Sequence, residues 1–115
     1  MNKAPFIKDH RVSEIDVNGR TVWIVRFTSR LFLKEAFDSL AELQVALGDD
    51  QRASKTVAIL PNGERPWTVV EFLLKKERLY AVCNCSDDKV GDKGAFNRWE
   101  AEHAAESLNQ QPPQP

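Results

Sequence analysis

Residues 11–27 read RVSEIDVNGRTVWIVRF, two runs of alternating polar and apolar residues separated by Asn18-Gly19. Alternation with a period of two is the pattern of a β-strand that is buried on one side. Asn-Gly readily adopts the positive φ angles of a type I′ turn, the two-residue turn that joins antiparallel strands. The stretch therefore predicts a β-hairpin near the start of the chain.

A two-residue turn also fixes the register of this hairpin, because it places Val17 opposite Arg20 and Arg11 opposite Arg26. The side chains then divide between two faces. One face carries Ile15, Val17, Val22 and Ile24, and the other carries Val12, Trp23, Val25 and Phe27. Because both faces are partly apolar, we expect a helix to cover one of them and another part of the protein to contact the other.

The period of the apolar residues changes after the hairpin. They now recur three and four positions apart, which lines one face of a helix: Leu33, Ala36, Phe37, Leu40, Leu43 and Leu47. Gly48 follows the last of them, where a glycine often ends a helix. We predict a helix over residues 32–47.

The second half of the chain contains three short runs that favour strands, at residues 56–60, 67–74 and 79–85. Their content of β-branched and aromatic residues supports this assignment. A competing interpretation makes residues 66–77 a helix with Pro66 in its first turn. Residues 86–94 contain three aspartates and two glycines and are predicted to form a loop, and a second helix is predicted from Ala95 to Leu108.

These elements follow one another in the order β-β-α-β-β-β-α, which predicts an α+β fold with a mostly antiparallel sheet and two helices. The 115 residues suit one small domain, and 42% hydrophobic with 29% charged residues is a globular composition. We assign residues 1–9 to an N-terminal arm, 10–108 to the domain and 109–115 to a disordered tail rich in proline and glutamine. No internal repeat is visible.

The sequence contains no arrangement of residues that indicates catalysis. It lacks a Gly-x-Ser-x-Gly elbow, a glycine-rich phosphate loop and a His-Glu-x-x-His pair. Cys83 and Cys85 could face one ion from the same side of a strand, but His10 and His103 do not complete a set of four zinc ligands. Buried free cysteine is the simpler interpretation. If Leu74 lies opposite Leu79, both cysteines share an apolar face with Val70, Phe72 and Ala81. We therefore expect no enzymatic activity, no catalytic residue, no metal and no cofactor, although a small enzyme with a site shared between subunits is a third candidate.

The distribution of charge is more informative than the net charge of -1. Residues 1–30 contain six basic and three acidic side chains, so the predicted hairpin is basic. Arg11 and Arg26 face each other in the expected register, and like charges there need a neutralising group. An acid of the same chain or solvent could supply it, as could a carboxylate or phosphate of a partner. We select Arg11, Arg20 and Arg26 as candidate partner-binding residues.

The segment from Pro61 to Trp67 is the second candidate binding region. It has prolines at positions 61 and 66, which limit its freedom in the unfolded chain and lower the cost of ordering it on binding. Arg65 and Trp67 belong to the residue types that dominate interface energies. Trp67 could equally be the first buried residue of its strand, and Trp99 could pack on the sheet or seal a homodimer.

The sequence thus predicts a small cytoplasmic protein-interaction or regulatory module without catalytic activity of its own. Its longest apolar stretches are too short to span a bilayer, and the start of the chain carries no secretory signal pattern, so we expect no membrane association. The alternative is a nucleic-acid-binding protein that lays the basic hairpin against phosphates, with aromatic side chains for stacking. The expected partner is another protein, and a homodimer is compatible with the sequence.

Overall fold

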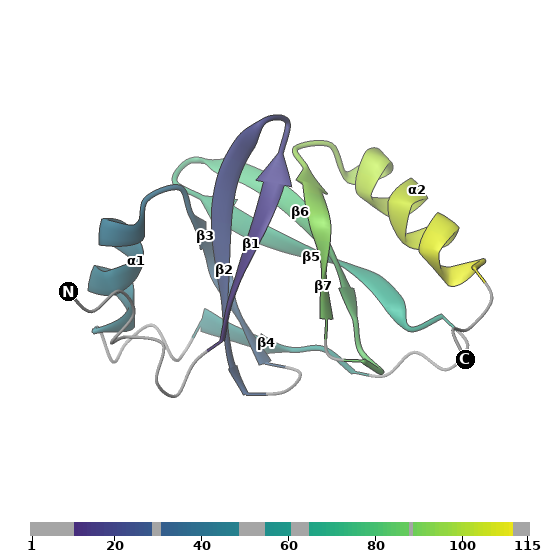
Figure 1. The fold of residues 1–115 in the computed structure, drawn as a ribbon, viewed down its shortest axis with the longest axis horizontal. Coiled ribbons are helices and arrows are strands. Elements are labelled where there is room, and N and C mark those ends of the chain that lie inside the picture. The colour runs from purple at the N-terminus through teal and green to yellow at the C-terminus, as the bar shows by residue number, and fades with distance from the viewer. Residues whose placement is uncertain (1–10, 29–30, 49–54, 61–64, 88, 112–115) are drawn as a thin grey trace.

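The computed structural model describes residues 11–28, 31–48, 55–60, 65–87 and 89–111. Its elements, shown in Figure 1, are β1 (Arg11–Val17), β2 (Arg20–Thr28), β3 (Leu31–Phe37), α1 (Leu40–Leu47), β4 (Thr56–Ala58), β5 (Trp67–Leu74), β6 (Glu77–Asn84), β7 (Lys89–Ala95) and α2 (Arg98–Asn109). The prediction of one small α+β domain with a mostly antiparallel sheet and two helices is confirmed at this coarse level. The predicted arm at residues 1–9 and residues 112–115 of the predicted tail lie outside the described residues.

The strands close into a six-stranded barrel, which the sequence did not predict. Around the barrel the order is β1-β2-β3-β5-β6-β7, and β7 pairs with β1. The β7–β1 and β3–β5 pairs are parallel and the other four are antiparallel. β4 lies beside β3 as an additional antiparallel strand, and the two helices lie on opposite sides of the barrel (Figure 1).

The predicted hairpin is confirmed, and its register is the expected one, with Val17 opposite Arg20 and Arg11 opposite Arg26. Asn18 and Gly19 have φ angles of 53° and 88°, as a type I′ turn requires. One predicted face points into the barrel, where its four apolar residues are buried with Phe72 and Leu79. The other packs outside the barrel with Leu43 and Ala46 of α1. Alternation along one hairpin therefore supplies two separate hydrophobic cores.

The predicted helix over residues 32–47 is wrong in its first half, which forms β3. Phe32 and Ala36 face the barrel interior, whereas Leu33 and Phe37 face α1. A spacing of four residues is even, so it also keeps two side chains on one face of a strand. The apolar pattern was therefore compatible with both structures, and pairing with β2 selected the strand. Only residues 40–47 form a helix, capped at its start by the Ser39 side chain, which accepts a hydrogen bond from the Glu42 N–H.

The predicted loop over residues 86–94 is also wrong, because residues 89–95 form β7. This strand is short of apolar residues and contains two glycines, so its sequence does not resemble a strand. A Cβ atom at Gly94 would lie 3.0 Å from the Tyr80 carbonyl oxygen and 3.0 Å from Val17 Cγ2. Glycine at this position allows β1, β7 and β6 to approach one another and close the barrel.

The strand interpretation of residues 67–74 is confirmed, and the competing helix at 66–77 is wrong. The register of β5 and β6 differs from the expected one: Leu74 faces Glu77 rather than Leu79, and the turn is the two residues Lys75 and Lys76. Because the shift is two residues, the predicted inward face is unchanged. α2 starts at Arg98 rather than Ala95 and includes Asn109, which we had assigned to the tail.

The barrel consists of two halves with the same arrangement, although the sequence showed no repeat. β1, β2, β3 and α1 correspond in order to β5, β6, β7 and α2. The two parallel pairs, β3–β5 and β7–β1, are the junctions between the halves. Each half is a three-stranded antiparallel unit followed by a helix, so neither is closed without the other.

Candidate protein-interaction surface

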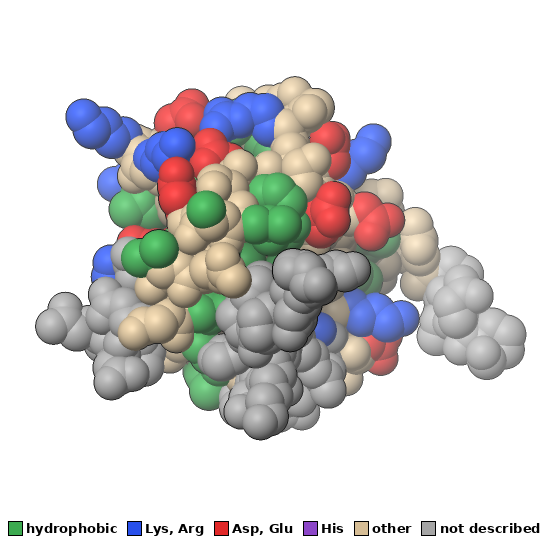
Figure 2. Space-filling view, turned by 60° about the vertical axis from the view of Figure 1, so that its left-hand side comes forward, with side chains coloured by type: hydrophobic (Ala, Val, Ile, Leu, Met, Phe, Trp, Pro, Cys, Tyr) green, Lys and Arg blue, Asp and Glu red, His purple; other side chains and the backbone are tan. Residues whose placement is uncertain are grey.

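The hairpin arginine nearest the turn is engaged by acids of the same chain. Arg20 Nη2 lies 3.1 Å from Asp38 Oδ2, and Arg20 Nη1 lies 3.2 Å from Glu77 Oε1. Its guanidinium carbon also lies 5.6 Å from the centre of the Phe96 ring. Lys75 Nζ also lies 3.4 Å from Asp38 Oδ1. Figure 2 shows basic and acidic side chains intermixed over the upper part of this face. The positive charge of Arg20 is therefore shared with internal carboxylates.

Arg26 lies on the same hairpin but at the other end of the barrel. Its side chain is half-buried, and its guanidinium carbon lies 5.9 Å from the centre of the Phe32 ring. Burial raises the pKa of the Cys83 thiol, and the positive charge of Arg26 lowers it by a smaller amount. The Arg26 guanidinium therefore interacts electrostatically with a thiol in the barrel interior. Arg11 faces Arg26 in the register, and its side chain lies outside what the structure describes.

Arg65 and Trp67 lie together beside α2, away from Arg20. Arg65 Nη2 lies 3.9 Å from Glu106 Oε2, and the Trp67 side chain is half-buried. The Trp67 main chain is held by the side-chain amide of Asn109. Asn109 Oδ1 accepts from the Trp67 N–H at 2.9 Å, and Asn109 Nδ2 donates to the Trp67 carbonyl oxygen at 3.0 Å. The four candidate residues whose side chains are described thus do not form one surface, and the role of all five in binding a partner stays a prediction.

A groove that the sequence did not indicate lies between β4 and β5. Its volume is about 540 Å³, and it is lined by Lys34, residues 57–60 and residues 68–71. The lining includes Leu60, whose side chain is 73% exposed, and the partly buried Val57 and Val69. In the sequence, the prolines at 61 and 66 indicate only a break between two strands. Nothing in this local pattern shows that the two strands lie on the same side of β3 with a groove between them.

The edge of β5 that faces this groove is largely unpaired within the described residues. The Cys85 N–H donates to the Pro66 carbonyl oxygen at 2.9 Å. Since antiparallel hydrogen bonds alternate along a strand, the main-chain groups of residues 66, 68, 70, 72 and 74 point to β6 and those of the odd-numbered residues point away. Asn109 satisfies Trp67, and Leu73 pairs with Glu35 of β3. Val69 and Glu71 remain, with their main-chain groups directed to the groove.

Cys83 and Cys85 are buried thiols that form no disulfide. They lie in the barrel core with Val70, Phe72 and Ala81, the residues expected on their face. Burial raises the pKa of the Cys83 thiol to about 12, with a further contribution from Cys85. A thiol that stays protonated is a poor nucleophile. Among the described residues, no group of three or more His, Cys, Asp or Glu side chains is placed to hold a metal ion.

Comparisons with known proteins identify no relative: no protein-family model, no curated protein and no solved structure matches the chain. Within the described part of the chain, neither helix is long and apolar enough to cross a membrane.

Proposed function

We propose that this protein is a protein-interaction module that binds an extended segment of a partner in the groove between β4 and β5. The partner segment pairs with the outer edge of β5, as an added strand. The observation that carries this proposal is a groove of about 540 Å³ beside a stretch of β5, including Val69 and Glu71, that pairs with no strand on that side among the described residues.

Strand addition uses main-chain hydrogen bonds for affinity and side-chain contacts for specificity. Both are supported at this edge. Val69 and Glu71 direct their main-chain N–H and carbonyl groups to the groove side, two residues apart, which is the repeat of hydrogen-bonding positions along a strand. Val57, Leu60 and Val69 offer apolar surface on either side.

The length of the open edge suits a short segment. It is bounded at one end by Asn109, which pairs with Trp67, and at the other by β3, which pairs with Leu73. The stretch between these limits, residues 68–72, is covered by an extended segment of about five residues, which spans roughly 16 Å. Such a small interface is typical of transient recognition, which fits an interaction or regulatory role better than a permanent complex.

The other predicted properties form part of the same proposal. Arg65 and Trp67 lie at the start of the strand that binds the partner, so they are placed to contact residues beyond the groove. We propose a cytoplasmic setting, which the two buried cysteines without a disulfide support, and no catalytic activity. Nucleic-acid binding by the hairpin stays the alternative prediction. It receives less support, because Asp38 and Glu77 offset the charge of Arg20.

Selection of peptides from a displayed random library, followed by affinity measurements on the full chain, tests this function. Leu60→Asp places a charge in the groove and is expected to weaken binding of the selected peptides about tenfold or more. Val45→Asp is the matched control, since Val45 on α1 is 72% exposed, close to the 73% of Leu60, and lies outside the groove.

The control variant should bind like the original protein. Failure to select any peptide would contradict the proposal, as would peptides that bind Leu60→Asp as tightly as they bind Val45→Asp.

A further inference from the structure

The two halves of the barrel agree in detail, which allows one half to be compared with the other position by position. In β2–β3 the register passes from Ile24–Ala36 to Arg26–Phe32. In β6–β7 it passes from Ala81–Gly94 to Cys83–Val90. In both pairs, a step of two residues along the second strand of the half (β2 or β6) matches a step of four residues along the third strand (β3 or β7). The third strands therefore bulge at the same place, and Phe32 corresponds to Val90.

The same correspondence holds at the junctions and at the helices. Glu35 pairs with Leu73 where β3 meets β5, and Lys93 pairs with Asp16 where β7 meets β1, which are equivalent positions in the two halves. Two residues separate each helix from its third strand, and the second of them, Ser39 or Asn97, is an N-cap residue whose side chain accepts a main-chain hydrogen bond.

One element of the first half has no counterpart. β4 pairs with residues 31–33 of β3, on the edge that faces away from β2. The equivalent residues of β7 are Lys89, Val90 and Gly91. Among the described residues no strand pairs with that edge, because β1 and β7 are paired only at Asp16–Lys93 and Val17–Gly94. Figure 1 shows β1 and β7 together at one end and separating toward the other.

We propose that this β7 edge, residues 89–91, is a second strand-binding site, which takes an extended segment of a partner protein in the position that β4 occupies in the first half. The proposal does not rest on the groove between β4 and β5, since it concerns the opposite junction of the barrel.

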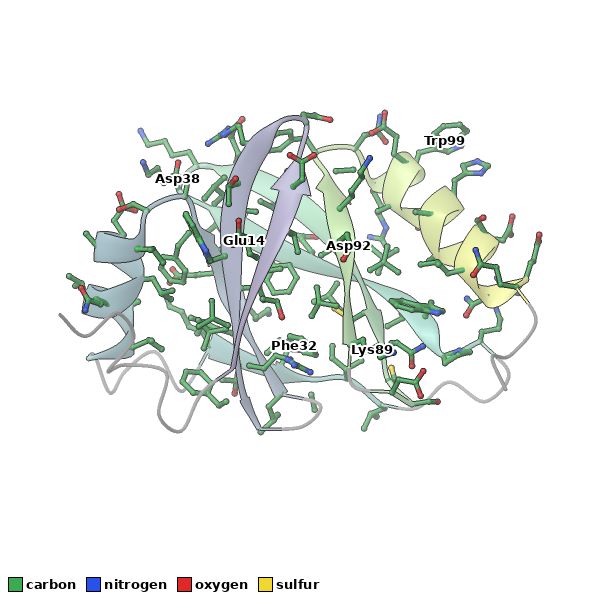
Figure 3. All side chains as sticks on the ribbon, in the orientation of Figure 1. Glu14, Phe32, Asp38, Lys89, Asp92 and Trp99 are labelled. Carbon is green, nitrogen blue, oxygen red and sulfur yellow. The ribbon has the colours of Figure 1, made fainter. Side chains whose placement is uncertain are left out.

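The main chain of Val90 is oriented to receive such a segment. The Cys85–Pro66 hydrogen bond places the main-chain groups of the odd-numbered β6 residues toward β5 and those of the even-numbered residues toward β7. Lys89, opposite Asn84, therefore faces β6, and Val90, opposite Cys83, directs its N–H and carbonyl away from β6. This edge faces the first half of β1, on which Glu14 lies across from Asp92 of β7 (Figure 3).

β4 shows what kind of segment fits. It runs antiparallel to β3, with Val57 and Ile59 packed against the barrel core and Ala58 exposed. The segment that binds the β7 edge is therefore expected to run antiparallel to β7 and to carry two apolar side chains separated by one residue. The half-buried Val90, which packs on the same core, is the residue they contact.

The test supplies such a segment to the full chain by a tether. A copy of residues 55–60, Lys-Thr-Val-Ala-Ile-Leu, is joined to the C-terminus through a flexible Gly/Ser linker of about twelve residues, which reaches roughly 19 Å on average. Tethering raises the effective concentration of the segment to the millimolar range. The matched control replaces the central Ala of the copy by Pro, which removes a main-chain donor and disrupts an extended pairing.

Amide hydrogen exchange, resolved by residue, is the measurement. The Val90 amide is expected to exchange about tenfold more slowly with the β4 copy than with the proline control. Equal exchange at Val90 in the two proteins overturns the inference. Slower exchange at Val69 and Glu71 in place of Val90 also overturns it, because the segment then occupies the groove, and that result supports the proposed function instead.

Discussion

The side-chain amide of Asn109 occupies the position of a neighbouring strand beside Trp67. It accepts one main-chain hydrogen bond and donates another, as a paired residue would. This contact joins the end of α2 to the start of β5 and sets one limit of the open edge. A single asparagine therefore determines where strand pairing on β5 ends.

Replacement of this residue tests its contribution to stability. Asn109→Ala removes both hydrogen bonds and is expected to lower the free energy of unfolding by about 1–3 kcal/mol, because the Trp67 groups lose their partners. Asn109→Asp keeps the acceptor and loses the donor, so its free energy of unfolding should lie between those of the original protein and Asn109→Ala. Urea denaturation measures both, with Gln110→Ala at the exposed next position as the control. Equal stability of Asn109→Ala and the control would contradict the role assigned to the amide.

The buried thiol of Cys83 predicts a decrease in stability in alkali. Burial raises the pKa of this thiol from 9.0 to about 12. Between these values the unfolded chain loses the thiol proton and the folded chain keeps it, so unfolding is favoured increasingly as the pH rises. Below pH 9 both states are protonated and the contribution is constant.

Urea denaturation of the original protein and of Cys83→Ala, at pH 9 and at values approaching 12, checks this difference. The decrease in stability should be smaller in the variant, whose other titrating groups are the same. Identical decreases would show that Cys83 is not the group responsible.

At the scale of elements, the least strand-like segment closes the barrel. β7 connects β6 to β1, and its two glycines lie where neighbouring strands come closest. A Cβ atom at Gly91 would lie 3.3 Å from the Val82 carbonyl oxygen, and at Gly94 the closest approach is 3.0 Å. Close approach of three strands, rather than a positive φ angle, explains these glycines.

Gly94→Ala is expected to destabilise the protein by about 1–3 kcal/mol, because Val17 and the Tyr80 main chain must move. Gly48→Ala is the matched control. There the nearest atom to an added Cβ is 3.6 Å away, and alanine restricts the unfolded chain, so a gain of up to about 1 kcal/mol is expected. Thermal unfolding of the two variants gives the comparison. Equal effects at both positions would contradict the close packing at the β1–β7–β6 junction.

At the scale of the whole molecule, each half of the barrel depends on the other. The inward side chains of β1 and β2 are buried against those of β5 and β6, and both junctions are parallel pairs between halves. An isolated three-stranded unit would leave this apolar surface in water. The equivalence of the halves therefore does not imply independent folding.

A fragment of residues 1–60, which contains β1–β4 and α1, should accordingly show no cooperative thermal transition. The full chain should show one transition, at the same temperature when followed by circular dichroism and by tryptophan fluorescence. Cooperative unfolding of the fragment would mean that one half carries a sufficient core of its own.

The features that the sequence predicted correctly are those that residues close together in the chain determine. The Asn18-Gly19 turn, the hairpin register and the two faces of the hairpin followed from residues within one stretch. The strand nature of residues 67–74 and the buried character of Cys83 and Cys85 followed in the same way. For the candidate site, the sequence singled out Arg65 and Trp67, whose role in binding stays a prediction, and it indicated neither the groove nor the strand edge beside it.

The sequence by itself determined the first hairpin, because a turn that needs positive φ angles and a strict period of two leave little alternative. Only the tertiary structure decided that residues 31–37 are a strand, that residues 89–95 close a barrel, and that parts of β5 and β7 pair with no strand on one side among the described residues. The reason is physical: a spacing of four suits helix and strand alike, and glycines carry no pattern. Which strand edges remain unpaired depends on contacts between segments more than fifty residues apart, such as Asp16 with Lys93.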